Sequence, residues 1–305
     1  MKNITLKVKD FNIRQVFLCG QCFRWYEEED GSFTGAAFGL CANMRQEGEM
    51  LHINTVLPAE NAGNAMDIRR LWEYYLDLAR DYGSIKKYLS ERDGKIGAAI
   101  ESGTGIRILR QEFWEAVVSF IISQNNNIPR IRGCIEKLCN LYGEPLGTIG
   151  GRSFWDIPEP QVLAELKAED LGEVRLGYRA SYLVETARQV VDLCNGLETG
   201  TGNGKSVRRQ IEEYFSKLNY DQAYGKLLEF QGVGPKVANC IALFGLGLMD
   251  SFPIDVWVKR VMARAYGMGE GETATMEKLA RERFAPYGGI AQQYLFYHIR
   301  ETEGK

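Results

Sequence analysis

Apolar and polar side chains alternate over residues 4–8, which is the period of a strand with one buried face. Two more strand-like runs, 22–28 and 32–39, are joined through Asp30-Gly31, a dipeptide that favours a tight hairpin turn. A further pair of strand-like runs turns at 46–49. The first sixty or so residues therefore predict an antiparallel sheet.

The periodicity then changes to that of amphipathic helices. Apolar residues recur every three or four positions from Ile68 to Ala79 and again from Phe113 to Ile121. Further helices are expected over 129–142, 159–166, 180–193, 205–228 and about 275–300, the last broken near Pro286. Residues 196–204 are rich in glycine and are expected to form a flexible connection.

These patterns predict an α+β fold. We expect an N-terminal domain with a twisted antiparallel β-sheet and helices over residues 1–103. A mostly α-helical domain should follow over 104–305, made of two helical subdomains. A helix–hairpin–helix motif is expected at about 222–247, because a Gly-Val-Gly turn separates two helical patterns there.

The turn at Gly232-Val-Gly234 is the first candidate for chemistry. The glycines allow a tight turn and close backbone approach, and Pro235 suits the first position of the following helix. A helix N-terminus offers unpaired N–H groups and its dipole to an anion. The pattern therefore predicts a grip on a DNA phosphate, although non-catalytic DNA-binding proteins use such hairpins too.

Lys236 lies in the first turn after this hairpin, and Cys240 lies one turn further along the same face. The commoner use of such a lysine is as a surface cation near a phosphate, but a partly desolvated amine can act as a nucleophile. Asp255 precedes another helical pattern, so it can be an N-cap. It can also stabilise a cationic, sugar-like transition state or move protons for the lysine. Together the two suggest attack at a sugar C1′.

Three consecutive asparagines, 125–127, fit a helix interior poorly because their side chains compete for backbone hydrogen bonds. They form either a polar connection between helices or a loop that aims its amides and Arg130 at a base edge. The two readings are about equally supported. At Tyr178-Arg179, core packing plus a surface charge is the commoner case, and an exposed wedge and cation that unstack DNA is the alternative.

Cys19 and Cys22 frame a short Gly-Gln segment. A zinc half-site would need a second pair of ligands, and a redox motif would need a βαβ context, and neither is present. A tight turn with exposed backbone at Gly20 is the favoured interpretation.

Composition narrows the class of protein. The 305 residues are 45% hydrophobic and 25% charged, as in ordinary globular proteins. No apolar run approaches the roughly 20 residues that cross a bilayer, and the N-terminus has no secretory h-region. Seven scattered cysteines indicate a reducing interior. We expect an intracellular protein without membrane association, in the cytoplasm or nucleoid of a prokaryote or the nucleus of a eukaryote.

Charge and histidine content limit the chemistry. The net charge of −3 argues mildly against nucleic acid, but basic residues concentrate in several segments, so charge leaves the question open. The two histidines, His52 and His298, are far apart, which disfavours histidine-based catalysis and multi-histidine metal sites. There is no Walker-type loop and no nucleophile elbow.

Seven motifs in order along nearly the whole chain carry a resemblance. The chain resembles the helix–hairpin–helix DNA glycosylases, and within them the 8-oxoguanine DNA glycosylase/lyase family of the eukaryotic type. The motifs are Gly20–Trp25, Gly105–Gln111, Ser123–Arg130, Leu176–Arg179, Gly232–Cys240, Pro253–Asp255 and Tyr287–Phe296.

The resemblance implies that Lys236 displaces the damaged base and forms a Schiff base with the sugar, assisted by Asp255. The flipped base would lie between Cys240 and Phe296, with Gln292 at its Watson–Crick edge. The Gly20 carbonyl would accept the N7–H that only the oxidised guanine carries, whereas ordinary guanine would present an opposing lone pair.

The resemblance also assigns the opposite strand. Asn125, Arg130 and Arg179 would hold the orphaned cytosine, and Tyr178 would wedge the strand. The family usually has a small residue where Gln124 stands, and a phosphate-touching histidine where Trp257 stands. An indole N–H can donate one hydrogen bond to phosphate but carries no charge.

The expected function is therefore excision of 8-oxoguanine opposite cytosine from duplex DNA, followed by β-lyase strand cleavage. No cofactor and no catalytic metal are expected, and the protein is expected to act as a monomer. The alternatives are a glycosylase for a formamidopyrimidine or alkylated purine and a non-catalytic hairpin DNA-binding protein. The iron–sulfur ligand run of the endonuclease III and adenine-glycosylase branches is absent, since Cys240 is the last cysteine.

Overall fold

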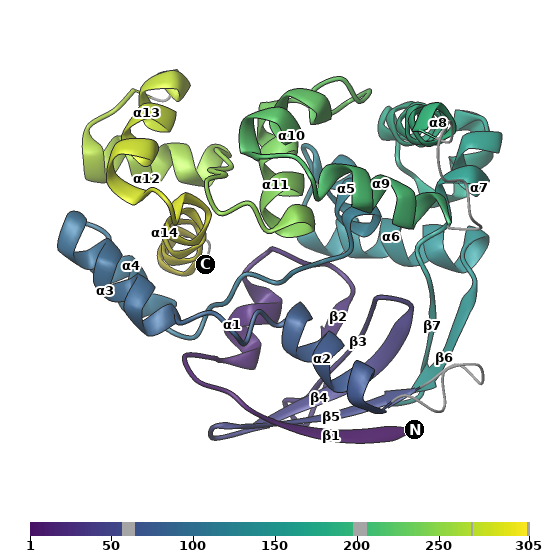
Figure 1. Cartoon of the computed structure of the whole chain (residues 1–305), viewed down its shortest axis with the longest axis horizontal. Coiled ribbons are helices and arrows are strands. Elements are labelled where there is room, and N and C mark those ends of the chain that lie inside the picture. The colour runs from purple at the N-terminus through teal and green to yellow at the C-terminus, as the bar shows by residue number, and fades with distance from the viewer. Residues whose placement is uncertain (57–64, 198–205, 270, 304–305) are drawn as a thin grey trace.

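An antiparallel sheet forms one side of the molecule, and most of the helices lie on the other (Figure 1). The computed structural model describes residues 1–56, 65–197, 206–269 and 271–303. The predicted N-terminal sheet is confirmed, with five strands in the order β1-β5-β4-β3-β2. Their bounds are β1 Lys2–Lys7, β2 Trp25–Glu27, β3 Phe33–Ala37, β4 Leu40–Glu47 and β5 Met50–Val56.

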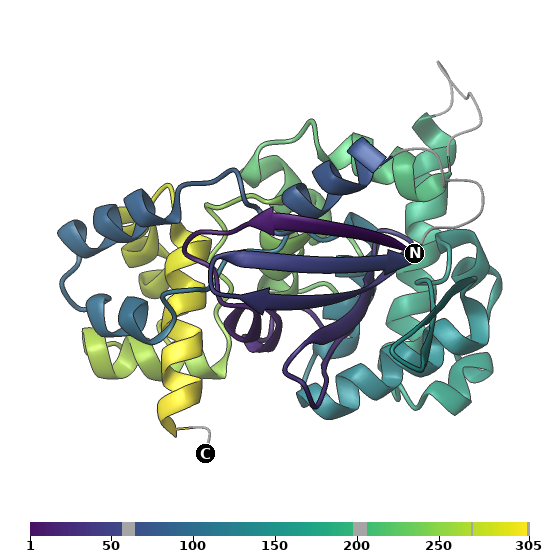
Figure 2. The ribbon, with the colours of Figure 1, turned by 90° about the horizontal axis from the view of Figure 1, so that it is seen from below.

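The inner face of the sheet packs against two helices, α1 (Ile13–Leu18) and α2 (Ala65–Tyr75). The Trp25 ring stacks on Phe17, with ring centroids 4.4 Å apart, and its indole N–H donates to the Tyr75 hydroxyl at 2.7 Å. This apolar layer fixes α1, and therefore the turn that follows it at Cys19–Cys22. Figure 2 shows the sheet from its outer side, with the helices behind it.

A second hairpin covers part of the outer face and was not predicted from the sequence. It consists of β6 (Pro145–Ile149) and β7 (Arg152–Trp155), which form a separate antiparallel pair. Its Ile149 and Phe154 pack with Ala36 and Cys41, which point away from the inner face because side chains alternate along a strand.

The helical part is built around α5 (Phe113–Ser123), whose residues from Phe113 to Ile122 are all buried. The helices that follow it in the chain are α6 Ile128–Tyr142, α7 Pro160–Glu165, α8 Arg179–Leu197, α9 Val207–Phe215, α10 Tyr220–Leu227, α11 Pro235–Leu246, α12 Val256–Tyr266, α13 Thr273–Phe284 and α14 Gly288–Glu303. Those that pack most closely against α5 are α6, α8, α9 and α11. A 3-10 helix spans Ala168–Val174. The predicted helix–hairpin–helix corresponds to α10 and α11. None of the described helices is long and apolar enough to cross a membrane.

Two apolar cores divide the chain. The sheet core draws on residues from Ile4 to Leu76 and includes Leu109, except that Cys19 and Phe23 pack in the helical core. The helices α3 (Tyr82–Arg92) and α4 (Gly97–Ser102) also pack in the helical core. The division at 103/104 stays a prediction. The expected flexible connection at 196–204 falls largely outside the described residues.

Candidate active site

A cavity of about 820 Å³ opens between α5, α6 and α11 on one side and α12 and α14 on the other. A volume of this size accommodates a small organic group such as a nucleobase. Most of the predicted site residues line it: Gly20, Asn125, Tyr178, Gly234, Lys236, Asp255, Trp257 and Phe296. A smaller adjoining space of about 50 Å³ adds Cys240 and Gln292. Gly232 and Arg130 line neither, and nor does Arg179.

The hairpin before α11 has the geometry expected of an anion-binding turn. Gly232 has φ +76°, and a Cβ there would lie 2.4 Å from the Tyr182 ring, so only glycine fits. Gly234 is the N-cap of α11, has no side chain to cap the helix, and is followed by Pro235 at the first position. The N–H groups of the first turn are therefore left for a ligand.

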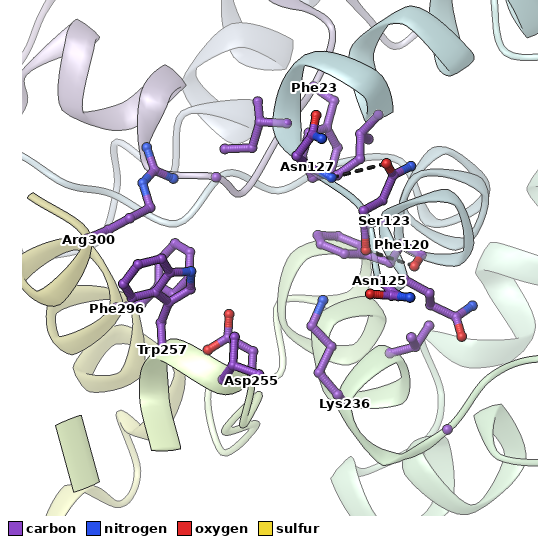
Figure 3. A pocket seen from close by; sticks show the side chains of 18 of the residues that line it. Phe23, Phe120, Ser123, Asn125, Asn127, Lys236, Asp255, Trp257, Phe296 and Arg300 are labelled. Atoms are coloured by element: carbon purple, nitrogen blue, oxygen red, sulfur yellow. Dashed lines mark hydrogen bonds between the residues drawn. The ribbon is translucent and has the colours of Figure 1, made fainter. Parts of the chain in front are cut away.

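Lys236 is half-buried, and its amine enters the cavity that Asp255 also lines, as Figure 3 shows. Its Nζ lies 5.6 Å from the centroid of the Phe120 ring, so an apolar wall flanks the amine. Cys240 is one turn further on and 4% exposed. Burial raises the pKa of its thiol, although Lys236 opposes this shift, so the thiol is neutral at neutral pH.

Asp255 is both an N-cap and a lining residue, so the two roles considered from the sequence coexist. Its Oδ1 accepts the backbone N–H of Val258 at 2.8 Å and thereby caps α12. The carboxylate faces the cavity beside Phe296 and Trp257 (Figure 3). Burial raises the pKa of Asp255, while the Val258 N–H and then Lys236 lower it.

The Gly20 turn and α14 form the wall opposite α11. Gly20 has φ +86°, as expected of a tight turn, and the flanking Cys19 and Cys22 are buried free thiols. Burial raises the pKa of Cys19 to about 11, which makes it unreactive near neutral pH. On α14, Gln292 is 4% exposed, and its buried Oε1 has no hydrogen-bond partner among the described residues.

The asparagine segment is both a connection and a cavity wall. Asn127 caps α6 by accepting the N–H of Arg130 at 3.0 Å, and Asn126 donates to the Ile122 carbonyl at 3.1 Å. Asn125 adopts a left-handed conformation, with φ 44°, and lines the cavity. The side chains of Asn126 and Asn127 thus hold the loop, and Asn125 lines the space where a ligand would lie.

The expectation of an exposed cation at Arg179 is wrong. Its side chain is buried, with the residue 4% exposed, and Nη2 donates to the Asn125 carbonyl at 2.8 Å. It also donates to the Gln124 carbonyl, with Nε at 2.7 Å. The sequence does not show that the Gln124–Asn125 carbonyls lie under this turn. Arg179 thus holds the loop that carries Asn125.

Tyr178 is 50% exposed at the edge of the cavity, which agrees with the exposed reading of this aromatic residue. Arg130 is exposed, and its Nη2 donates to the Arg175 carbonyl at 3.3 Å. Trp257 lines the cavity with the Arg260 guanidinium over its ring, 4.6 Å from the centroid. At the position where the family that the chain resembles usually has a histidine, this chain has an indole with the Arg260 guanidinium stacked on it.

The sequence did not indicate every residue that lines the cavity. Phe23 and Arg300 line the cavity, and neither was expected to. The helical spacing of Gln292, Phe296 and Arg300 would have indicated that these three side chains share one face of α14.

Two family models match the chain. Residues 3–117 match the N-terminal domain of 8-oxoguanine DNA glycosylase, and residues 118–286 match the HhH-GPD superfamily of base excision DNA repair proteins. The two matches meet within α5, so they cover the sheet, the hairpin and most of the cavity lining.

Individual relatives agree with these models. The Saccharomyces cerevisiae N-glycosylase/DNA lyase is 38% identical over 65% of this chain, which spans about half (52%) of that relative. A probable N-glycosylase/DNA lyase of Methanothermobacter thermautotrophicus is 30% identical over 77% of this chain and 76% of its own length.

A solved structure extends the match to the fold. The Clostridium acetobutylicum 8-oxoguanine glycosylase/lyase, bound to double-stranded DNA with cytosine opposite 8-oxoguanine, is 35% identical. It superposes with a TM-score of 0.85 over 99% of this chain and 98% of its own. The chain belongs to the 8-oxoguanine DNA glycosylase family, within the HhH-GPD superfamily of base excision DNA repair proteins.

Proposed function

We propose that this chain is a bifunctional DNA glycosylase/lyase that removes 8-oxoguanine opposite cytosine from duplex DNA. The observation that carries the proposal is a cavity with a small adjoining space, which together bring an amine and a carboxylate beside two acceptors that have no hydrogen-bond partner among the described residues. The amine and carboxylate are Lys236 and Asp255, and the acceptors are the Gly20 carbonyl and Gln292 Oε1. The relatives named above act as N-glycosylases and DNA lyases, which supports the same reaction here.

The DNA backbone docks on the uncapped N-terminus of α11, with Gly232 and Gly234 allowing close approach of a phosphate. Trp257 offers an indole N–H to a neighbouring phosphate. These contacts read no sequence, which suits a repair enzyme that meets its lesion in any context.

Chemistry requires the damaged nucleotide to leave the helix and enter the cavity. The Lys236 amine, in its neutral form, attacks C1′ while the N-glycosidic bond breaks and its electron pair leaves with the base. The Asp255 carboxylate stabilises the positive charge that develops on the sugar. Loss of a proton from nitrogen and opening of the sugar ring give a Schiff base. Loss of a proton from C2′ then expels the 3′ phosphate by β-elimination.

Recognition of the base rests on the two acceptors. The Gly20 carbonyl accepts the N7–H of 8-oxoguanine, and guanine instead presents a lone pair there. Gln292 Oε1 is buried and has no partner in the part of the chain that the structure describes, so a purine with N–H groups on its Watson–Crick edge satisfies it. Cys240 and Phe296 pack on the two faces of the base.

Asn125 and Arg130 hydrogen-bond the orphaned cytosine, and the exposed Tyr178 fills the gap in the strand. Arg179 contributes indirectly, because its guanidinium fixes the carbonyls of the loop that carries Asn125. The proposed partner is thus duplex DNA, bound by a single copy of the chain.

Borohydride trapping on a duplex with 8-oxoguanine opposite cytosine tests the proposal, because reduction fixes the Schiff base covalently. The wild type should trap, Lys236→Gln should not, and Lys278→Gln should trap like the wild type since Lys278 is an exposed lysine of α13. Absence of trapping by the wild type, or equal trapping by Lys236→Gln, would contradict the mechanism. A panel of formamidopyrimidine and alkylated-purine duplexes establishes the lesion preference.

A further inference from the structure

Side chains hold three of the four carbonyl groups from Leu18 to Gln21, at the end of α1 and in the turn that follows it. The Leu18 carbonyl accepts Nη2 of Arg300 at 2.7 Å, and the Cys19 carbonyl accepts Nε2 of Gln293 at 2.8 Å. The Gln21 carbonyl accepts Nε2 of Gln111 at 2.7 Å. Between them, the Gly20 carbonyl has no hydrogen-bond partner among the residues that the structure describes. Among these four carbonyls, the side chains around the turn thus leave the one at Gly20 free.

Two of the three donors come from α14, the helix that carries Gln292 and Phe296. Gln293 is 2% exposed, so its amide is removed from water and its bond to Cys19 is shielded from competition. The helix α14 therefore supplies two kinds of side chain. Gln292 and Phe296 are proposed to contact the base, and Gln293 and Arg300 hold the turn that contains Gly20.

Arg300 also sets the position of Gly20 by direct packing. A Cβ at Gly20 would lie 3.0 Å from Nη1 of Arg300 and 3.2 Å from Cε1 of Phe296. The Arg300 guanidinium lies over the Phe296 ring, 5.6 Å from its centroid. In Figure 3 this guanidinium lies above Phe296 at the edge of the cavity. The turn, the arginine and the aromatic ring therefore form one packed unit.

We propose that Gln293 and Arg300 are positioning residues that aim the Gly20 carbonyl at N7 of the lesion and thereby set the discrimination of 8-oxoguanine from guanine. The inference rests on the proposed function. At N7, the two bases differ in a single hydrogen bond, the one to the Gly20 carbonyl. The geometry of this bond therefore matters more than that of most contacts. A displacement of about 1 Å is enough to lose such a bond or a hundredfold in rate.

The experiment compares two reactions of the same protein. Removal of 8-oxoguanine needs both base recognition and Lys236, whereas cleavage of a preformed abasic site in the same duplex needs Lys236 but no base. Gln293→Leu keeps the buried volume and removes the donor to Cys19. Arg300→Met keeps the stem of a partly exposed side chain and removes the donor to Leu18. Glu301→Gln changes an exposed position of the same helix and is the control.

Single-turnover excision of 8-oxoguanine should fall about tenfold or more in Gln293→Leu and in Arg300→Met. Abasic-site cleavage should stay within about twofold of the wild type in both, and Glu301→Gln should match the wild type in both reactions. An equal fall in the two reactions would indicate general damage to the fold and would overturn the inference. If Gln293→Leu does not fold, Arg300→Met alone decides.

Failure of the inference is distinguishable from failure of the proposed function. A wild type that excises 8-oxoguanine, with both variants as fast, overturns the positioning role and leaves the function standing. A wild type that cleaves abasic sites but leaves 8-oxoguanine in place overturns the proposed substrate itself.

Discussion

The side-chain oxygen of Asn239 accepts the backbone N–H of Phe252 at 3.0 Å. Asn239 lies three residues after Lys236 on α11, and Phe252 lies three residues before Asp255. The Asn239 amide also donates to the carbonyl of Pro235 at 3.0 Å, directly before the lysine. One buried side chain, 4% exposed, therefore joins the segment that carries the amine to the segment that carries the carboxylate.

Replacing Asn239 with leucine should separate these two segments. We expect single-turnover base excision to fall about tenfold or more, because the reacting groups lose their relative placement. Stability should also fall by about 1–3 kcal/mol, since the Phe252 N–H and the Tyr220 hydroxyl lose their acceptor. Affinity for a duplex with an uncleavable abasic analogue should change little. Excision rates, chemical denaturation and binding titrations measure these three effects.

Tyr220→Phe is the matched control for this variant. The Tyr220 hydroxyl donates to the same Asn239 oxygen at 2.9 Å, but it does not lie on the connection to Phe252. Its removal should cost about 1 kcal/mol of stability and leave the excision rate near that of the wild type. Equal rates in Asn239→Leu and Tyr220→Phe would show that the link does not position the site.

Gly20→Ala should impair recognition through both backbone strain and contact. At φ +86° a side chain costs about 1–2 kcal/mol, and the new Cβ would press on Arg300 and Phe296. The turn must shift, and 8-oxoguanine excision should fall by an order of magnitude or more. Thermal unfolding and single-turnover excision measure the two losses.

Gly31→Ala separates strain from contact. Gly31 has φ +77°, and a Cβ there would meet no atom within 4 Å. Gly31→Ala should lose an amount of stability comparable to that lost by Gly20→Ala, and should keep the wild-type excision rate. If Gly31→Ala loses as much activity as Gly20→Ala, the effect of Gly20→Ala comes from stability and not from the cavity wall.

The sheet and the long helices could be predicted from the sequence because their burial is periodic. The β6–β7 hairpin could not, because residues 145–149 and 152–155 are mostly exposed or half-buried and show no alternation. Its turn is marked only by Gly150 and Gly151, both with positive φ. The hairpin is stabilised by packing on Cys41 and Ala36, which lie far away in the sequence.

The site, too, could be predicted from the sequence only in part. Side chains that line the cavity or the small space beside it, such as Lys236 and Gln292, belong to motifs that can be recognised in the sequence. Side chains that hold the backbone, such as Gln293 and Asn239, bond to N–H and carbonyl groups of distant turns, and any residue could supply those groups. Arg179 shows the same limit, because its exposure depends on where the carbonyls of another loop lie.

Asp255→Asn should uncouple activity from stability. Burial raises the pKa of Asp255, so the ionised carboxylate destabilises the folded state at neutral pH. Asparagine is an equally good N-cap, so we expect the stability at pH 7 to rise. Excision should fall by about 10²–10³ because the charge that stabilises the transition state is gone.

The pH dependence and the cap can be tested separately. The gain in stability of Asp255→Asn should disappear below the ordinary aspartate pKa of 3.8, where the wild-type carboxyl is protonated in both folded and unfolded chains. Asp255→Ala lacks the cap and should be less stable than Asp255→Asn by about 1 kcal/mol. A gain that persists unchanged at low pH would contradict the assigned cause.

Glu112 lies in a buried cluster in which carboxylates outnumber arginines. Burial raises its pKa to about 7, while Arg208, with Nη1 at 3.4 Å, opposes the shift and Asp156 and Glu115 add to it. Because the folded pKa exceeds the unfolded value of 4.5, the stability from this group is present below 4.5 and is lost as the pH rises through about 7. Glu112→Gln cannot ionise, so its unfolding free energy should exceed that of the wild type at pH 8 by on the order of 1 kcal/mol.

Chemical denaturation of Glu112→Gln at pH 4, 6 and 8 measures this difference. Its advantage over the wild type should grow with pH across that range, whereas Glu91→Gln, at an exposed position of α3, should follow the wild type throughout. A constant difference at all three pH values would mean that the pKa of Glu112 is the same in the folded and unfolded chains. In that case the pairing with Arg208 would offset desolvation, and the assigned cause would be wrong.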